Sequence, residues 1–145
     1  MSKFNAIALA VTVGIFLAVQ PPVNAGLGKV VSPRVAALHS FLTGTVVLFL
    51  INIFYRNLGA YASIIKVHPI YWIGGLLGVV IVLFTIQVIP VLGTGTTLSI
   101  FVAVQLIIGV LIDHFGMFGV PRSPIGILKI LGIVFMLIGV RLVIK

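Results

Sequence analysis

The stretch AVQPPVNAGLGK, residues Ala18–Lys29, decides how the rest of the sequence is interpreted. It ends an apolar run that starts at Phe4, and it holds a glutamine, two prolines, an asparagine and two glycines. It could be the cleavage site of a secretory signal peptide, because Lys3 precedes an apolar core and Val23-Asn24-Ala25 offers small residues. It could instead be a polar interruption inside a membrane-spanning helix. The two interpretations give unrelated proteins.

Composition favours a membrane protein. The chain has 145 residues, of which 61% are hydrophobic and only 7% are charged, and its mean hydropathy is +1.40. A soluble domain of this size needs far more charge to cover its surface. Stretches of nearly 20 residues that are almost free of charge are typical of transmembrane helices. The sequence therefore predicts an all-α integral membrane protein.

Apolar segments recur along the chain. A helix needs about 20 residues to cross the hydrocarbon core of a bilayer. The connections are short and hold glycine, proline, serine and basic residues, and the longest is Arg56–Pro69. Pro90 is expected to close the third segment and Asp113 the fourth. We predict a single transmembrane domain, residues 1–145, with five spans at about 4–28, 34–55, 70–89, 96–112 and 124–144.

The four further predicted spans argue against the signal-peptide interpretation, because a membrane protein with four spans needs no cleaved signal. Small residues also recur every four positions in the first segment, a stripe that permits close approach of helices. The stripe comprises Ala6, Ala10, Gly14 and Ala18. If the first span continues, Pro21 and Pro22 free backbone carbonyls one turn earlier, beside Gln20 and Asn24. Such polar backbone is tolerated only inside protein or beside a wet cavity, which predicts a binding site or pathway.

The net charge of +8 comes from nine Lys/Arg against one acid, Asp113. The bases lie at the ends of the apolar segments, where they meet lipid headgroups. Anionic membrane lipids are the expected partner, and nucleic acid is not, because no basic patch with interleaved aromatics is present. With no cysteine, disulfides and thiolate metal sites are excluded.

The bases are almost evenly divided between the two membrane faces. Five spans place five bases on the face of the N-terminus and four on the other; they are Lys3, Arg56, Lys66, Arg122 and Lys129 against Lys29, Arg34, Arg141 and Lys145. The difference in Lys/Arg number between the two faces sets the orientation of a membrane protein. Because this difference is small here, either the N-terminus is held weakly inside or the chain inserts both ways. Oppositely oriented copies would pair as an antiparallel dimer, like the inverted repeats within transporters.

Several polar residues are candidates for substrate binding. Gln105 lies near the middle of the fourth span, where an amide forms a helix–helix hydrogen bond or contacts substrate. His39 is either a hydrogen-bonded interfacial histidine or a proton-sensitive group. Thr43 lies at similar depth, although a membrane threonine usually bonds its own helix backbone. The complete candidate set is Gln20, Asn24, His39, Thr43 and Gln105.

We expect no enzyme, because no metal-ligand spacing, nucleophile elbow, phosphate-binding loop or carboxylate pair occurs. No catalytic residue, cofactor or metal ion is predicted. His68 and His114 are placed in loops, and Asp113 is expected to form an interfacial salt bridge or order a loop. No span contains a carboxylate, unlike the small multidrug exporters, which use a buried glutamate. A site of amides, hydroxyls and bases should favour neutral, zwitterionic or anionic solutes.

These motifs resemble a known family. Gln20–Gly28 resembles the "Q-x-P-x-N-x-x-L-G" end of the first helix in the YdcZ-like, half-size family of the drug/metabolite transporter superfamily. Ser32–Thr45, Trp72–Gly78 and Leu111–Gly116 are similar to its later helices. Thr94–Thr97 departs from the alanine-rich start expected there.

The resemblance implies a multi-pass protein of the bacterial cell inner membrane and half of a ten-helix inverted-repeat fold. It also implies an antiparallel dimer, either a homodimer or a pair with a homologue. We therefore predict a secondary transporter of a small metabolite that works by alternating access. The alternatives are a non-transporting accessory or assembly subunit and a small multidrug-type cation exporter. Gly132 and Gly139 are candidates for the dimer contact.

Overall fold

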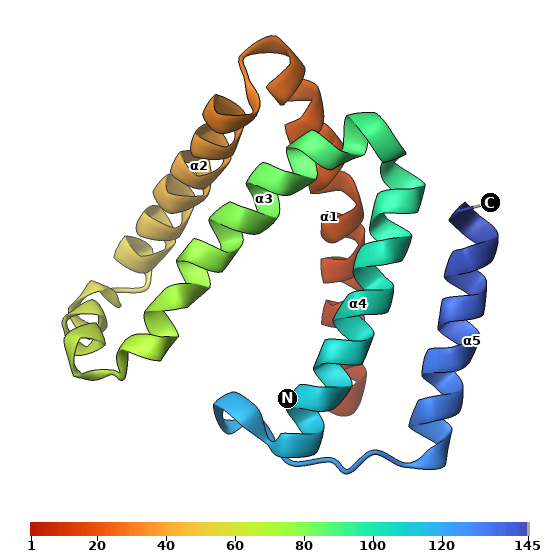
Figure 1. Cartoon of the computed structure of the whole chain (residues 1–145). Coiled ribbons are helices and arrows are strands. Elements are labelled where there is room, and N and C mark those ends of the chain that lie inside the picture. Colours follow the sequence, from red (N-terminus) through yellow and green to blue (C-terminus); the bar gives the residue numbers. More distant parts are fainter. Residues whose placement is uncertain (145) are drawn as a thin grey trace. The chain divides into compact units, whose positions relative to one another are not determined.

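The computed structural model describes residues 1–144 and contains five long α-helices (Figure 1). Each is long and apolar enough to cross a membrane, which confirms the prediction of an all-α protein with five candidate spans. Lys145, counted above among the bases, lies outside the described residues. The helices are α1 (Lys3–Val30), α2 (Pro33–Phe54), α3 (Ile73–Leu92), α4 (Thr94–Phe115) and α5 (Ile127–Ile144), with short 3-10 helices η1 (Leu58–Lys66), η2 (Pro69–Trp72) and η3 (Met117–Gly119).

The first helix continues through its two prolines. Helix α1 starts at a Ser2 cap, whose hydroxyl accepts a hydrogen bond from the Asn5 N–H at 3.2 Å. Pro21 and Pro22 lie inside the helix, which ends only at Val30. The expected polar interruption is therefore not a break in the helix. It is a loss of two backbone donors within a continuous helix.

Three expected helix ends were wrong. Pro90 does not close the third helix, because α3 continues to Leu92 and stops before Gly93, which has a φ of 78°. A proline in the last turn removes only one hydrogen bond, so the helix can pass it. Helix α4 likewise passes Asp113 and ends at Gly116, a left-handed C-cap with a φ of 65°. Helix α5 begins at Ile127, three residues after the expected Pro124.

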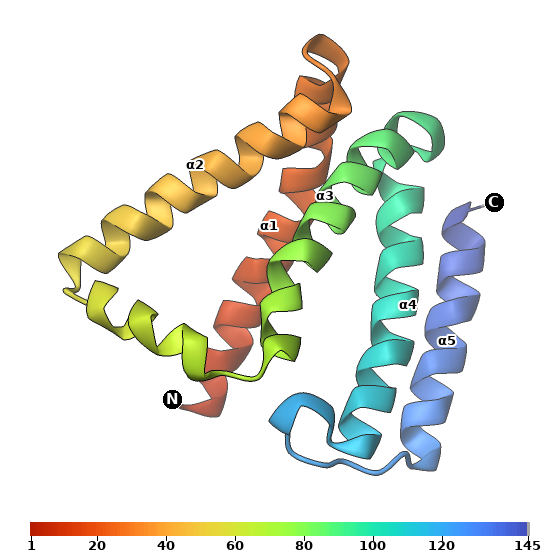
Figure 2. The ribbon, with the colours of Figure 1, turned by 60° about the vertical axis from the view of Figure 1, so that its left-hand side comes forward.

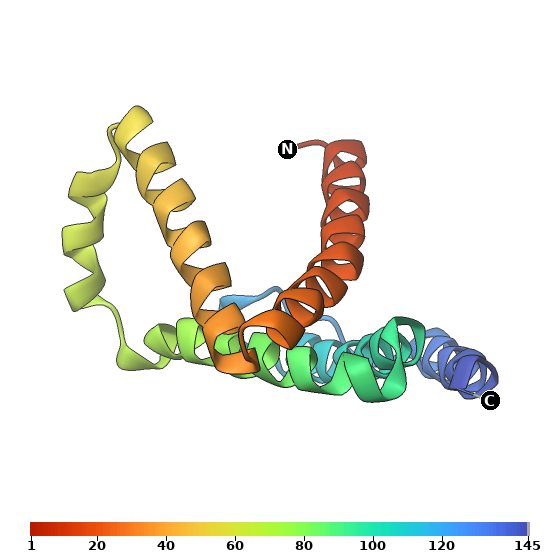
Figure 3. The same ribbon diagram turned by 90° about the horizontal axis from the view of Figure 1, so that it is seen from above.

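The chain divides into two compact units, Met1–Val91 and Leu92–Lys145. In the first, α1 and α2 form a hairpin whose tight turn carries the cap residue Ser32. The two helices lie side by side next to this turn and diverge away from it (Figure 3). The core of the unit lies where α3 meets the hairpin. It comprises Ala36, Ala37 and Ile86, with Leu27, Val82 and Leu83 packed against them.

The second unit is an antiparallel pair of α4 and α5 (Figure 2). Hydrogen bonds order its connection: the Arg122 Nε–H donates to the His114 carbonyl at 3.0 Å, and the Ile125 N–H donates to His114 Nδ1 at 3.2 Å. His114 lies in the last turn of α4, so its predicted loop position was wrong. Lys129, inside the predicted fifth span, lies in the first turn of α5 and donates to the Ser123 hydroxyl at 2.8 Å.

Candidate functional site

A polar contact joins the first two spans. The Asn24 side-chain amide on α1 donates from Nδ2 to the Ser40 hydroxyl on α2 at 3.3 Å. Asn24 is only 8% exposed, and a buried amide is costly unless it is hydrogen-bonded. Asn24 is therefore held by the protein, and its polar partner Ser40 is not among the predicted site residues.

The geometry of the hairpin explains this pairing. The turn is centred on Ser32, so residues equally far from Ser32 on α1 and α2 lie opposite each other. Asn24 then lies opposite Ser40, and Gly28 lies opposite Ala36. A Cβ atom at Gly28 would be 3.8 Å from the Ala36 Cβ. Small side chains at these positions let the backbones approach closely, as in membrane helix packing. Ser40 could have been found from its spacing, because it follows Ala36 by four residues and therefore lies on the same face of α2.

The other candidates of the first unit are exposed. Gln20, His39 and Thr43 all present accessible side chains. The Thr43 hydroxyl donates to the His39 carbonyl at 2.9 Å, which confirms that this threonine bonds its own helix. Gln20 makes no side-chain hydrogen bond within residues 1–144. It lies one turn before Asn24 and so farther from the α1–α2 turn, and the two helices diverge away from that turn (Figure 3).

Gln105 lies on α4 in the second unit, and its side chain is exposed. The structure therefore brings Asn24 together with Ser40, and Thr43 with the His39 backbone, and it gives no such contact for Gln105. Gln87 on α3 behaves differently, because its Nε2 donates to the Leu83 carbonyl of its own helix at 3.0 Å. Gln87 is thus an amide satisfied without a partner helix.

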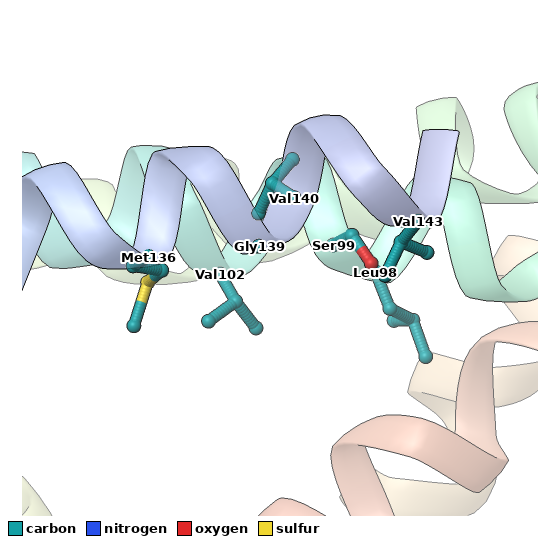
Figure 4. A pocket seen from close by; sticks show the side chains of 7 residues that line it. All are labelled: Leu98, Ser99, Val102, Met136, Gly139, Val140 and Val143. Atoms are coloured by element: carbon teal, nitrogen blue, oxygen red, sulfur yellow. The ribbon is translucent and has the colours of Figure 1, made fainter. Parts of the chain in front are cut away.

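The second unit also carries an apolar pocket between α4 and α5 (Figure 4), with a volume of about 380 Å³. Its lining comprises Leu98, Ser99, Val102, Met136, Gly139, Val140 and Val143. Ser99 is the polar member, and its hydroxyl already donates to the Gly95 carbonyl at 2.8 Å. The pocket offers no polar group that would orient a hydrophilic solute, so we do not place the site there.

Charge within the spans is scarce. Asp113 is exposed near the end of α4 and, within residues 1–144, forms no ion pair. Its backbone carbonyl accepts from the Ser123 N–H at 2.8 Å, so this position orders the connection through its backbone. The described residues contain no group of His, Cys, Asp and Glu that could hold a metal ion. Away from their ends, what the helices offer chemically is hydrogen bonding by uncharged groups.

The Asn24–Ser40 contact can be tested by a double-mutant cycle. We expect Asn24→Ala and Ser40→Ala each to destabilise the fold, with a coupling free energy of about 0.5–1.5 kcal/mol, typical of interhelical hydrogen bonds in membranes. Unfolding in mixed detergent micelles would measure it. Thr45→Ala is the control for Ser40→Ala, because Thr45 bonds the Phe41 carbonyl of its own helix. Additive effects of Asn24→Ala and Ser40→Ala would contradict the contact.

Fold and site together define a multi-pass helical membrane protein with uncharged polar groups in its spans. Residues 5–142 match the family described as "Putative inner membrane exporter, YdcZ". The chain belongs to this family, which confirms the resemblance found in the sequence. It is a multi-pass inner-membrane protein of transporter type. No curated protein and no solved structure matches the chain.

Proposed function

We propose that the protein is a secondary transporter of a small neutral, zwitterionic or anionic metabolite, and that it exports this solute by alternating access in an antiparallel dimer. The observation that carries the proposal is the polar content of the spans: exposed amides at Gln20 and Gln105 and no carboxylate within α1, α2, α3 or α5. Exposed amides at membrane depth need protein or water as partners. A substrate pathway supplies both.

The dimer is favoured by two further features. Helix α5 packs on α4 but has no buried residue, so much of its surface is left for lipid or a second subunit. The division of bases, five on one face against four on the other, gives little bias for either orientation. Two inverted copies would form a ten-helix assembly of the kind that inverted-repeat transporters build within one chain.

Orientation can be measured by cysteine labelling, because the chain contains no native cysteine. Gly59→Cys in η1 and Val31→Cys in the α1–α2 turn probe opposite faces, and both positions are exposed. A Cβ atom at Gly59 would meet nothing within 4 Å. We expect each single cysteine to be labelled by an impermeant maleimide from both sides of the membrane. Labelling of each from one side only would contradict dual topology.

Substrate class can be tested in proteoliposomes with radiolabelled amino acids, dicarboxylates, polyols and the lipophilic cation tetraphenylphosphonium. We expect saturable uptake from one of the first three groups, reduced by at least about tenfold in Gln105→Leu, since a lost polar contact leaves the solute unpaired. Gln87→Leu is the matched control, because Gln87 bonds its own helix, and it should retain uptake. Saturable tetraphenylphosphonium uptake that depends on Gln105 would contradict the proposal.

A further inference from the structure

The two prolines of α1 leave two backbone carbonyls without their helical donors. Proline has no N–H, so Pro21 and Pro22 cannot bond the carbonyl oxygens of Leu17 and Ala18. Both residues are exposed, Leu17 by 52%. A backbone acceptor at this depth needs another donor. The continuous helix thus has two carbonyl oxygens in its middle that lack a backbone N–H donor. All other carbonyls in the middle of an α-helix normally accept such a hydrogen bond.

Only one of these carbonyls lies on the polar face of α1. At about 100° per residue, Leu17, Gln20 and Asn24 fall within an arc of about 60°. Ala18 lies about 100° away from Leu17. Asn24 uses its Nδ2 on Ser40, which leaves its Oδ1 as an acceptor, and the Gln20 amide has no hydrogen bond within residues 1–144. The three residues that carry these acceptors therefore lie on one face of α1: Leu17 with its backbone carbonyl, Gln20 with Oε1 and Asn24 with Oδ1.

This set suits a hydrogen-bond donor that carries a positive charge. Charge-assisted hydrogen bonds are about twice as strong as neutral ones, and an ammonium group offers three donors to the three oxygens. None of the oxygens is charged, however, and the chain has a net charge of +8, which opposes a solute with net positive charge. A zwitterion supplies a positively charged donor without a net positive charge, because its own carboxylate balances its ammonium.

We infer that the Leu17 carbonyl, freed by Pro21, forms with Gln20 and Asn24 the binding site for the primary ammonium group of a small zwitterion. This inference rests on the proposed transport function and narrows its substrate class. It assigns different roles to the two prolines. Pro21 keeps an acceptor open on the substrate face, whereas Pro22 frees the Ala18 carbonyl on another side of the helix.

The test uses the full-length protein in proteoliposomes, with glycine and the L-amino acids that carry a primary α-amine as probes. For each amino acid that is taken up, uptake of its N,N,N-trimethyl analogue is measured alongside. The analogue keeps both charges and loses every N–H donor. We expect wild type to prefer the primary amine by at least about tenfold, because a site built to hydrogen-bond a group rejects an analogue without it.

The variants Pro21→Ala and Pro22→Ala separate hydrogen bonding from helix shape. Each removes a proline from the same turn and restores one N–H, so loss of a bend would affect both. Only Pro21→Ala gives the Leu17 carbonyl a helical donor. We expect the preference for the primary amine to fall at least about threefold in Pro21→Ala and to stay near the wild-type value in Pro22→Ala. Circular dichroism checks that both variants remain helical.

The outcomes separate the inference from the function on which it rests. Uptake of an amino acid with the preference lowered only in Pro21→Ala supports the inference. Equal effects of the two proline variants overturn it, as does equal uptake of amine and trimethyl analogue. Uptake restricted to dicarboxylates or polyols overturns the zwitterion site and leaves the transporter proposal standing. Uptake of none of these solute groups overturns both.

Discussion

Gly28→Ala is expected to destabilise the protein by about 1–3 kcal/mol, the range for overpacking a close contact. A Cβ atom at Gly28 would lie 2.5 Å from the Ile86 Cγ2 and 3.6 Å from the Pro33 Cα. The first distance is far inside van der Waals contact, so the buried Ile86 side chain or α3 itself would have to shift. The same site is the point where α1, α2 and α3 meet, so the displacement would spread through the core of the first unit. Unfolding in mixed detergent micelles measures the loss.

Two further variants test the cause. Gly26→Ala, two residues away on the same helix, would meet nothing within 4 Å, and we expect it to be neutral or to stabilise by up to about 1 kcal/mol from helix propensity. Ile86→Leu removes the Cγ2 methyl, so it should restore part of the stability of Gly28→Ala. If Gly28→Ala is as stable as Gly26→Ala, or if Ile86→Leu gives no rescue, the predicted clash at Gly28 is wrong.

The sequence predicted the helices well because their signal is local. The apolar segments, bounded by glycine, proline and basic residues, are long. An error of a few residues in a predicted helix end therefore does not change which helices are found. The ends themselves were less predictable. Pro90 and Asp113 were expected to end their helices because proline and aspartate have low helix propensity. Helices α3 and α4 nevertheless pass them and stop next to glycines with positive φ, Gly93 and Gly116. A left-handed backbone conformation decides the end more sharply than a lost donor.

The candidate site was only partly predictable, because its contacts join residues that are distant in sequence. Asn24 was found from its place beside the prolines, whereas its partner Ser40 follows from the register of the α1–α2 hairpin. That register depends on the tight turn at Ser32, which sequence periodicity does not encode. The close approach of Gly28 to Ile86 depends on how α3 packs on the hairpin. Exposure of Gln20 and Gln105 likewise depends on tertiary packing.

Locking the orientation is expected to abolish transport by either copy alone. In one variant, Ala62→Lys and Ser63→Lys in the exposed η1 raise the bases on the N-terminal face from five to seven against four. In the other, Lys3→Gln, Lys66→Gln and Val31→Lys leave three bases on that face against five. Because the face with more bases stays in the cytoplasm, the two variants should insert in opposite, single orientations. The Gly59→Cys label would report each orientation.

Each variant expressed alone should then give uptake near the background of empty vesicles, since same-way-up copies cannot form an inverted pair. Expressed together they should regain most of the wild-type uptake, because each supplies the orientation that the other lacks. Ala62→Gln with Ser63→Gln is the control for the first variant, since it alters the same positions without adding charge, and it should remain active. Full uptake by either singly oriented variant alone would mean that the functional unit contains no inverted partner. The near balance of bases would then reflect only weak orientation of an otherwise ordinary membrane protein.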